Sequence, residues 1–186
     1  MDLLWSTLIV LAAALGLWIA VAFNRMVRSR NLLREGFSGI DVQLKRRHDL
    51  IPKLLDAVRT YSAHEKATFE HLAELRNLSR STEQLSRRQD GENSLTDGLK
   101  RLFALAEAYP QLKADRNFLD LQQQLTEVED SLQMARRYYN GAVRDYNIQV
   151  ESFPSNFVAG LFGFGREEFF QIVTTSEHHA PVVETE

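Results

Sequence analysis

The sequence predicts an all-α protein in which an N-terminal transmembrane helix precedes a long antiparallel four-helix bundle. No charged residue occurs between Leu3 and Phe23, apolar residues recur at steps of three and four beyond it, and prolines and glycines number only 4 and 9. No alternating β-branched run predicts a sheet. We expect four parts: an anchor over 1–23, a helical bundle over 24–153, a Phe/Gly-rich apolar segment over 154–173 and a disordered tail over 174–186.

The uncharged run at 3–23 is long enough to cross a bilayer. As a helix rising about 1.5 Å per residue it spans roughly 31 Å, the thickness of a hydrocarbon core. Asp2 is the only charged side chain before the run, whereas four arginines follow it: Arg25, Arg28, Arg30 and Arg34. The positive-inside rule therefore places the N-terminus outside and the body in the cytoplasm. We expect a bacterial inner-membrane protein.

A signal peptide and a buried core helix are the two other interpretations of this run. Ala20-Val21-Ala22 has the form of a signal-peptide cleavage site, but Met1-Asp2 is not a basic n-region and the arginines would resist translocation. A buried core helix is disfavoured because so long and apolar a run suits lipid better than a soluble bundle. We therefore predict a retained anchor.

The first soluble helix should continue directly from the anchor. Its apolar stripe contains one polar member, Arg47, and steps by three or four residues: Phe37, Ile40, Leu44, Arg47, Ile51, Leu54, Val58 and Tyr61. Pro52 lies within the stripe. It either kinks the helix or begins a new one capped by Asp49, and the unbroken phase of the stripe favours the kink.

Arg47 also belongs to a short basic run with Lys45, Arg46 and His48. The arginine is either solvated or paired with a carboxylate of the fourth helix, for which there are three candidates: Glu127, Glu129 and Asp130. Nucleic acid is not an expected partner, because the net charge is −3 and no further basic or aromatic surface supports the run.

The second helix should start after Tyr61, with a capping box at 62–65. Residues 79–94 are polar and contain an Asp90-Gly91 turn signal, so we expect the second helix to extend to about Arg88 and a mobile loop to follow it. The third, shorter helix then carries five apolar positions, Leu95, Leu99, Leu102, Ala106 and Tyr109, and ends at Pro110.

The fourth helix has the longest regular stripe, in steps of three and four from Phe118 to Tyr146. Asn117 is the expected cap, and the helix should end at about Ser152, before Phe153-Pro154. The apolar segment that follows either closes the end of the bundle as a flap or contacts the membrane or a partner. The residues expected at such a contact are Arg25, Arg28, Arg30, Phe157, Phe162, Phe164, Phe169 and Phe170.

No catalytic, cofactor-binding or metal site is predicted, and no cofactor is expected. The chain has no cysteine, none of its five histidines completes a Glu-x-x-His pair, and no phosphate loop or His-Glu-x-x-His motif occurs. His64 and His71 lie two helical turns apart near glutamates and could form only a weak metal site.

Five segments resemble the LemA family: IDVQLKRRHDLIPKLL at 40–55, EAYPQLKA at 107–114, NFLDLQ at 117–122, RRYYNGAVRDYN at 136–147 and ESFPSN at 151–156. The resemblance covers roughly 24–170; Phe37 departs from it, since many relatives have tryptophan there. It implies an N-terminal anchor and a four-helix cytoplasmic body, and no established biochemical activity. Some relatives are associated with building intracellular membrane compartments.

These observations together predict a membrane-anchored helical scaffold or self-assembling interaction protein involved in membrane organisation, and not an enzyme. The expected partners are the lipid bilayer, further copies of the chain and other membrane proteins. The alternative is a membrane-tethered adaptor or regulator of another enzyme, such as a protease or kinase.

Overall fold

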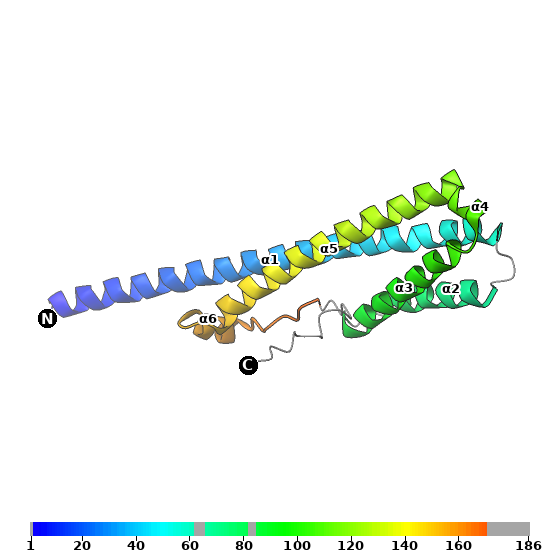
Figure 1. Cartoon of the computed structure of the whole chain (residues 1–186). Coiled ribbons are helices and arrows are strands. Elements are labelled where there is room, and N and C mark those ends of the chain that lie inside the picture. The colour runs from blue at the N-terminus through cyan, green and yellow to red at the C-terminus, as the bar shows by residue number, and fades with distance from the viewer. Residues whose placement is uncertain (1, 62–65, 82–84, 171–186) are drawn as a thin grey trace, which may run out of the picture. The chain divides into compact units, whose positions relative to one another are not determined.

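The computed structural model describes residues 2–61, 66–81 and 85–170, and every regular element within these ranges is a helix. The helices are α1 (Asp2–Arg59), α2 (Lys66–Ser81), α3 (Leu85–Ala106), α4 (Pro110–Lys113), α5 (Arg116–Glu151) and α6 (Ser155–Phe162) (Figure 1). The all-α prediction is confirmed over these ranges. The capping box at 62–65, the end of the apolar segment and the tail from 174 lie outside the described residues.

The chain packs as two compact units. The first comprises residues 1–42 and 132–169, and the second comprises residues 43–131 and 170–186. The long helices α1 and α5 contribute residues to both units, whereas α2, α3 and α4 belong to the second and α6 to the first. The four-helix arrangement predicted for the whole of 24–153 stays a prediction.

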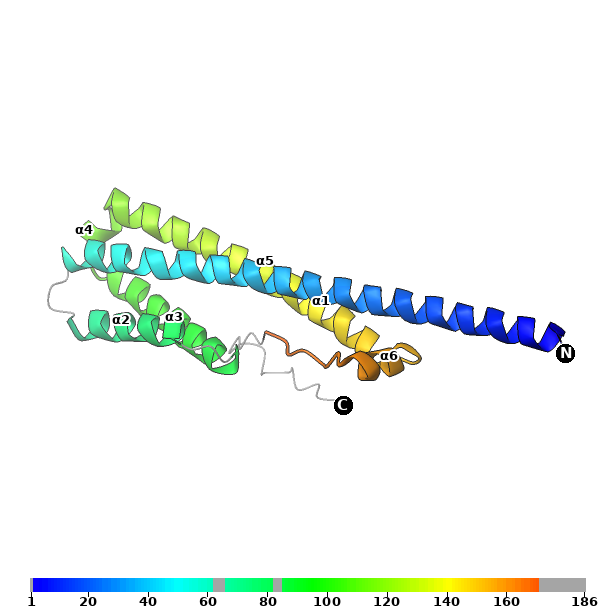
Figure 2. The same ribbon diagram turned by 180° about the vertical axis from the view of Figure 1, so that it is seen from behind.

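In the first unit, α5 runs antiparallel to α1 and leads into α6 (Figures 1 and 2). The pairs in contact fix this direction: Ser29 bonds to Gln149, and the ring of Phe37 lies 5.8 Å from that of Tyr139. Gly36 allows the close approach, since a Cβ there would lie 3.2 Å from the Cα of Tyr139. The helices pack through the sides that carry the predicted stripes.

The N-terminal part of α1 stands apart from this packing. Residues 2–18 are all exposed, including Leu3 at 79% and Leu11 at 68%. Among the described helices, α1 is the one long and apolar enough to cross a membrane. The helix then continues without interruption through Pro52, so a new helix beginning at that proline is wrong.

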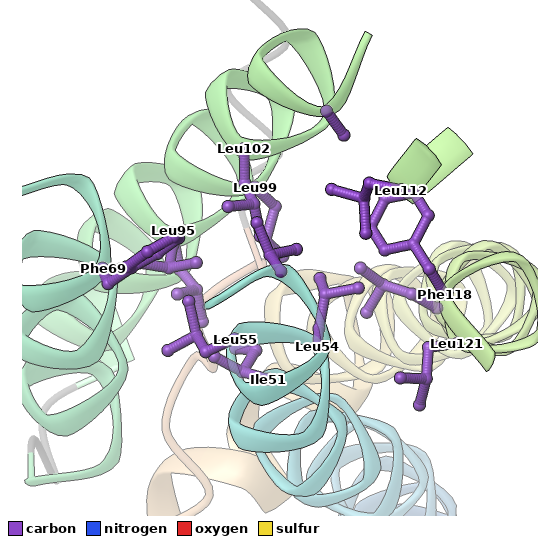
Figure 3. Packing of buried hydrophobic residues seen from close by; sticks show 14 residues of the cluster. Ile51, Leu54, Leu55, Phe69, Leu95, Leu99, Leu102, Leu112, Phe118 and Leu121 are labelled. Atoms are coloured by element: carbon purple, nitrogen blue, oxygen red, sulfur yellow. The ribbon is translucent and has the colours of Figure 1, made fainter. Parts of the chain in front are cut away.

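The second unit has a core to which five helices contribute. Its buried side chains are Ile51, Leu54, Leu55, Val58, Phe69, Leu72, Leu95, Leu99, Leu102, Ala106, Leu112, Phe118, Leu121 and Leu125. Figure 3 shows Leu54 of α1 and Leu99 of α3 directed toward the same interior as Phe118 of α5. Burial of this many leucine-sized side chains, each worth about 1.5–3 kcal/mol, is the main source of stability here.

Two predicted boundaries are corrected. The second helix ends at Ser81 and not at about Arg88, and the mobile loop expected after Arg88 is helical, because α3 begins at Leu85. The helices α2 and α3 approach closely at Gly91, where a Cβ would lie 3.1 Å from the Cα of Ser79. The cap of α5 is Asp115 and not Asn117, because the Asp115 carboxylate accepts the Phe118 N–H at 2.9 Å.

Candidate functional site

Three charged or titratable side chains are buried together in the second unit. Arg47 and Glu92 are fully buried and His48 is 5% exposed. The Arg47 guanidinium donates from one terminal nitrogen to the Glu92 carboxylate at 2.9 Å, and His48 Nε2 donates to its other oxygen at 2.8 Å. A carboxylate can only accept, which assigns the proton to Nε2 of the ring. Glu92 thus binds two consecutive residues of α1.

The remaining groups of Arg47 reach two more partners. Its second terminal nitrogen donates to the Thr96 hydroxyl at 2.6 Å. Its Nε lies 2.8 Å from the Glu129 carboxylate of α5, an ion pair without the N–H alignment of a hydrogen bond. Glu129 is one of the carboxylates that the sequence offered for this pairing, and its side chain is 35% exposed. The guanidinium therefore joins α1, α3 and α5.

Pro52 adds a backbone contact to the cluster. A proline has no N–H, so the His48 carbonyl one turn earlier lacks its usual donor within the helix. The Arg76 guanidinium of α2 donates to this carbonyl at 2.8 Å. The Ser79 hydroxyl lies 2.9 Å from His48 Nε2 and donates to the Arg76 carbonyl. Pro52 thus removes one hydrogen bond within α1, and the carbonyl that it leaves accepts a hydrogen bond from α2 instead.

The electrostatics of the cluster keep Glu92 ionised. Burial by itself would raise the pKa of the Glu92 carboxyl, but the hydrogen bond from His48 and the charge of Arg47 outweigh it, and the pKa lies below its ordinary value. The hydrogen bonds and ion pairs of the cluster together join four helices, α1, α2, α3 and α5. Removing one member would leave another buried without its partner.

Glu92 is not among the residues predicted from the sequence, although the sequence contains a signal for it. The residue lies three positions before Leu95 and therefore continues the apolar stripe of α3. Arg47 was noticed for the same reason in the stripe of α1. Two opposite charges in the apolar stripes of two helices are an indication that the helices pair there, and this comparison could have found Glu92.

The apolar segment after Pro154 forms the second notable region, in the first unit. The ring of Phe23, the last residue of the uncharged run, lies 4.8 Å from that of Phe162 and 5.6 Å from that of Phe164, both edge to face. Arg30 places its guanidinium over the Phe164 ring at 6.0 Å. The segment therefore packs on α1 where the uncharged run ends.

The returning chain beyond Gly165 is held by side chains of α5. The Asn147 amide donates to the Glu167 carbonyl and accepts the Glu167 N–H, both at 2.9 Å. The Tyr139 hydroxyl donates to the Glu168 carbonyl at 3.0 Å. Burial and the nearby charges of Glu167 and Glu168 raise the pKa of Tyr139. These bonds satisfy backbone groups that have no helix or sheet of their own.

The predicted contact residues divide by exposure. Phe164 and Phe170 are buried, so neither ring is available to lipid or a partner, whereas Phe157, Phe162 and Phe169 are exposed. Arg25 and Arg28 are exposed as well, and Arg30 is partly buried. Arg166, also exposed, lies 3.5 Å from Glu151. The segment thus has one packed side, as a flap would, and one open side.

Metal ligation finds no support in the part of the chain that the structure describes, where no three His, Cys, Asp or Glu side chains are grouped to hold an ion. His64 of the weak pair considered above lies outside that part. The fold and the two regions define an all-α protein with a helical body and a helix able to cross a membrane.

A comparison with family models identifies this class more closely. The model of the LemA family matches residues 36–184, which is most of the chain, so the chain belongs to the LemA family. It is similar to Magnetosome proteins MamQ 2 and MamQ 1 of Paramagnetospirillum magneticum, each 29% identical over 180 residues, covering 82% of this chain and 66% of the relative. Protein LemA of Metamycoplasma hominis is 24% identical over 149 residues, covering 80% and 68%. The chain thus spans about two-thirds of the length of these relatives.

Proposed function

We propose that this protein is a single-pass membrane protein whose helical body acts as a scaffold or self-assembling interaction module in membrane organisation. One observation carries the proposal: the uncharged run at 3–23 is exposed over most of its length, yet it belongs to the same 58-residue helix that packs into the body. Exposed leucine, isoleucine and tryptophan over that length are costly in water and stable in lipid. A continuous helix would hold the body directly at the bilayer.

The arrangement of the charges supports an orientation. Arg25 and Arg28 are exposed on α1 just beyond the run, and Asp2 is the only charged side chain before it. We infer that the N-terminus lies outside and the body in the cytoplasm of a bacterial inner membrane. The similarity to magnetosome proteins supports a role connected with a membrane-bounded structure.

Orientation and assembly are tested separately. A reporter fused after Glu186 should be active only if it functions in the cytoplasm, and activity of a periplasm-only reporter would refute the orientation. Crosslinking in the native membrane, followed by mass analysis, should yield multiples of this chain. A stoichiometric complex with a protease or kinase would instead support the adaptor, and a species of one chain alone would contradict both.

A further inference from the structure

An open apolar face lies on α6. Phe153, Phe157 and Leu161 follow one another at steps of four and are 80%, 68% and 73% exposed. The Phe153 ring packs edge to face on the Phe157 ring at 5.9 Å. Val158 and Ala159, on the other side of the helix, are buried. The helix is thus apolar on two sides. One side packs on the rest of the first unit, and the other is uncovered.

The contacts with Phe23 fix where this face lies along α1. Gly163 ends α6 in the left-handed conformation, with φ at 71°, which an L side chain adopts only with strain. The Phe164 N–H then donates to the Ala159 carbonyl at 2.9 Å, and the chain turns back onto Phe23. On α1, burial begins at Ile19. The helix α6 therefore lies beside the last turn of the uncharged run.

The charges around this face match a lipid surface. No charged residue occurs from Phe153 to Gly165, and exposed Arg25 and Arg28 lie on α1 just beyond Phe23, whereas the segment itself is bordered by Glu151 and Arg166, which lie 3.5 Å apart as an ion pair. An uncharged aromatic segment beside the end of the uncharged run, with the arginines of α1 just beyond it, suits the boundary between acyl chains and anionic headgroups.

We propose that α6 and Phe153 form a second membrane contact, which lies in the headgroup region beside the exit of α1 with Phe157 and Leu161 directed into the lipid. The inference rests on the proposed anchor and deepens it. A single crossing helix leaves the attached body free to tilt and rotate. A second contact on the same unit restricts both motions and presents one fixed side of the body to its partners.

Because the chain has no cysteine, single spin labels can test the contact in the full-length protein. Labels are placed in three variants, Leu11→Cys, Phe157→Cys and Met134→Cys, reconstituted in vesicles of phosphatidylethanolamine and phosphatidylglycerol. Met134 is the matched control, since it belongs to the same unit and is 57% exposed. Electron paramagnetic resonance then compares the access of oxygen, which concentrates in lipid, with that of a water-soluble nickel chelate.

The ratio of oxygen access to nickel access should be several-fold higher at 11 and 157 than at 134. A ratio at 157 equal to that at 134, with a high ratio at 11, would overturn the second contact and leave the anchor standing. A low ratio at 11 would overturn the anchor itself. Spin–spin broadening at 157 with little access of either probe would assign the face to a second copy instead. Leu161→Cys repeats the measurement on the same face, and circular dichroism checks that each variant keeps its helix content.

Discussion

The two units attach their parts through different kinds of polar contact. In the second unit, full charges of opposite sign meet with no exposure, as Arg47 and Glu92 do across α1 and α3. In the first unit, the returning chain is held by neutral bonds from Asn147 and Tyr139 to backbone groups. Buried charges are costly to leave unpaired and neutral amides less so. The second unit should therefore respond more strongly to the loss of a single partner.

The largest expected effect is that of Arg47→Met. This change leaves the Glu92 carboxylate buried with His48 alone and leaves Glu129 without its cation, so the free energy of unfolding should fall by about 3–5 kcal/mol. Arg46→Met is the matched control, since Arg46 is exposed and its loss should cost less than about 0.5 kcal/mol. Urea unfolding of the full chain in detergent micelles, followed by circular dichroism, gives both values. Equal midpoints for the two variants would show that the buried ion pairs of Arg47 do not stabilise the second unit.

Acid should destabilise the second unit through the same carboxylate. The pKa of Glu92 is lowered in the folded protein, and that of Asp115 is lowered by its bonds with the Phe118 N–H and the Tyr61 hydroxyl. The unfolded chain therefore binds more protons, and stability falls once the pH drops below about 4–5, toward the folded pKa values. The loss should be smaller than in Arg47→Met, because protonation leaves the other groups in place.

The variant Glu92→Gln separates this effect from general acid unfolding. It should be less stable at neutral pH, and its urea midpoint should vary less with pH in the acid range than that of the parent chain. Parallel pH profiles for the two chains would show that Glu92 titrates alike in the folded and unfolded states.

The Tyr139 hydroxyl of the first unit should give stability the opposite dependence on pH. Because its pKa is raised in the folded protein, the free energy of unfolding should fall as the pH rises above about 10.

Apolar spacing was sufficient to predict the all-α class and most of the two longest helices. The stripe from Phe118 to Tyr146 lies within α5, which begins at Arg116, two residues before the start that a cap at Asn117 predicts. Local spacing predicts such elements because the helical period places every residue of the stripe on the same side of the helix, which is the side that packs. The phase of the stripe also favoured continuity of α1 across Pro52.

The beginning of α3 was not predictable by the same means. Residues 86–94 are polar and include Gly91, so their helix propensity is low, and the burial of Glu92 depends on side chains more than forty positions away. Glu92 is stable inside the unit only because Arg47 and His48 are there. The cap at Asp115 was missed for a related reason, since Asn117 is an equally good capping residue by type.

A smaller effect is expected from Asn147→Ala in the first unit. The change removes both bonds to Glu167 and leaves a backbone N–H and a carbonyl without these partners, which should cost about 1–3 kcal/mol. Asn147→Asp keeps an acceptor for the Glu167 N–H but cannot donate to its carbonyl. The Glu167 amide should exchange its hydrogen fastest in Asn147→Ala, as measured by hydrogen exchange with mass spectrometry. Unchanged exchange in both variants would show that the bonds between Asn147 and Glu167 do not hold the returning chain.

The smallest effects come from two helical glycines, and their expected signs differ between the units. Alanine is favoured over glycine in a helix by about 1 kcal/mol. Among the described residues, no atom outside the neighbouring turns of α5 lies within 4 Å of a Cβ at Gly141, so Gly141→Ala should raise the free energy of unfolding by up to that amount. At Gly91 the Cβ would lie 3.1 Å from the Cα and 3.2 Å from the Cβ of Ser79. The backbone of α2 must then move, which lengthens the bond between Ser79 and His48.

The gain in helix propensity should therefore be offset in Gly91→Ala, which should be no more stable than the parent chain and should unfold at a lower urea concentration than Gly141→Ala. A further variant, Ser79→Ala, decides whether the contact or the bond is responsible, since it removes the hydroxyl while keeping the α2 backbone in place. If Gly91→Ala stabilises the chain as much as Gly141→Ala does, α2 and α3 are not closely packed at this point. The hydrogen bonds between Ser79, His48 and Glu92 would then not hold α2 and α3 at a fixed distance.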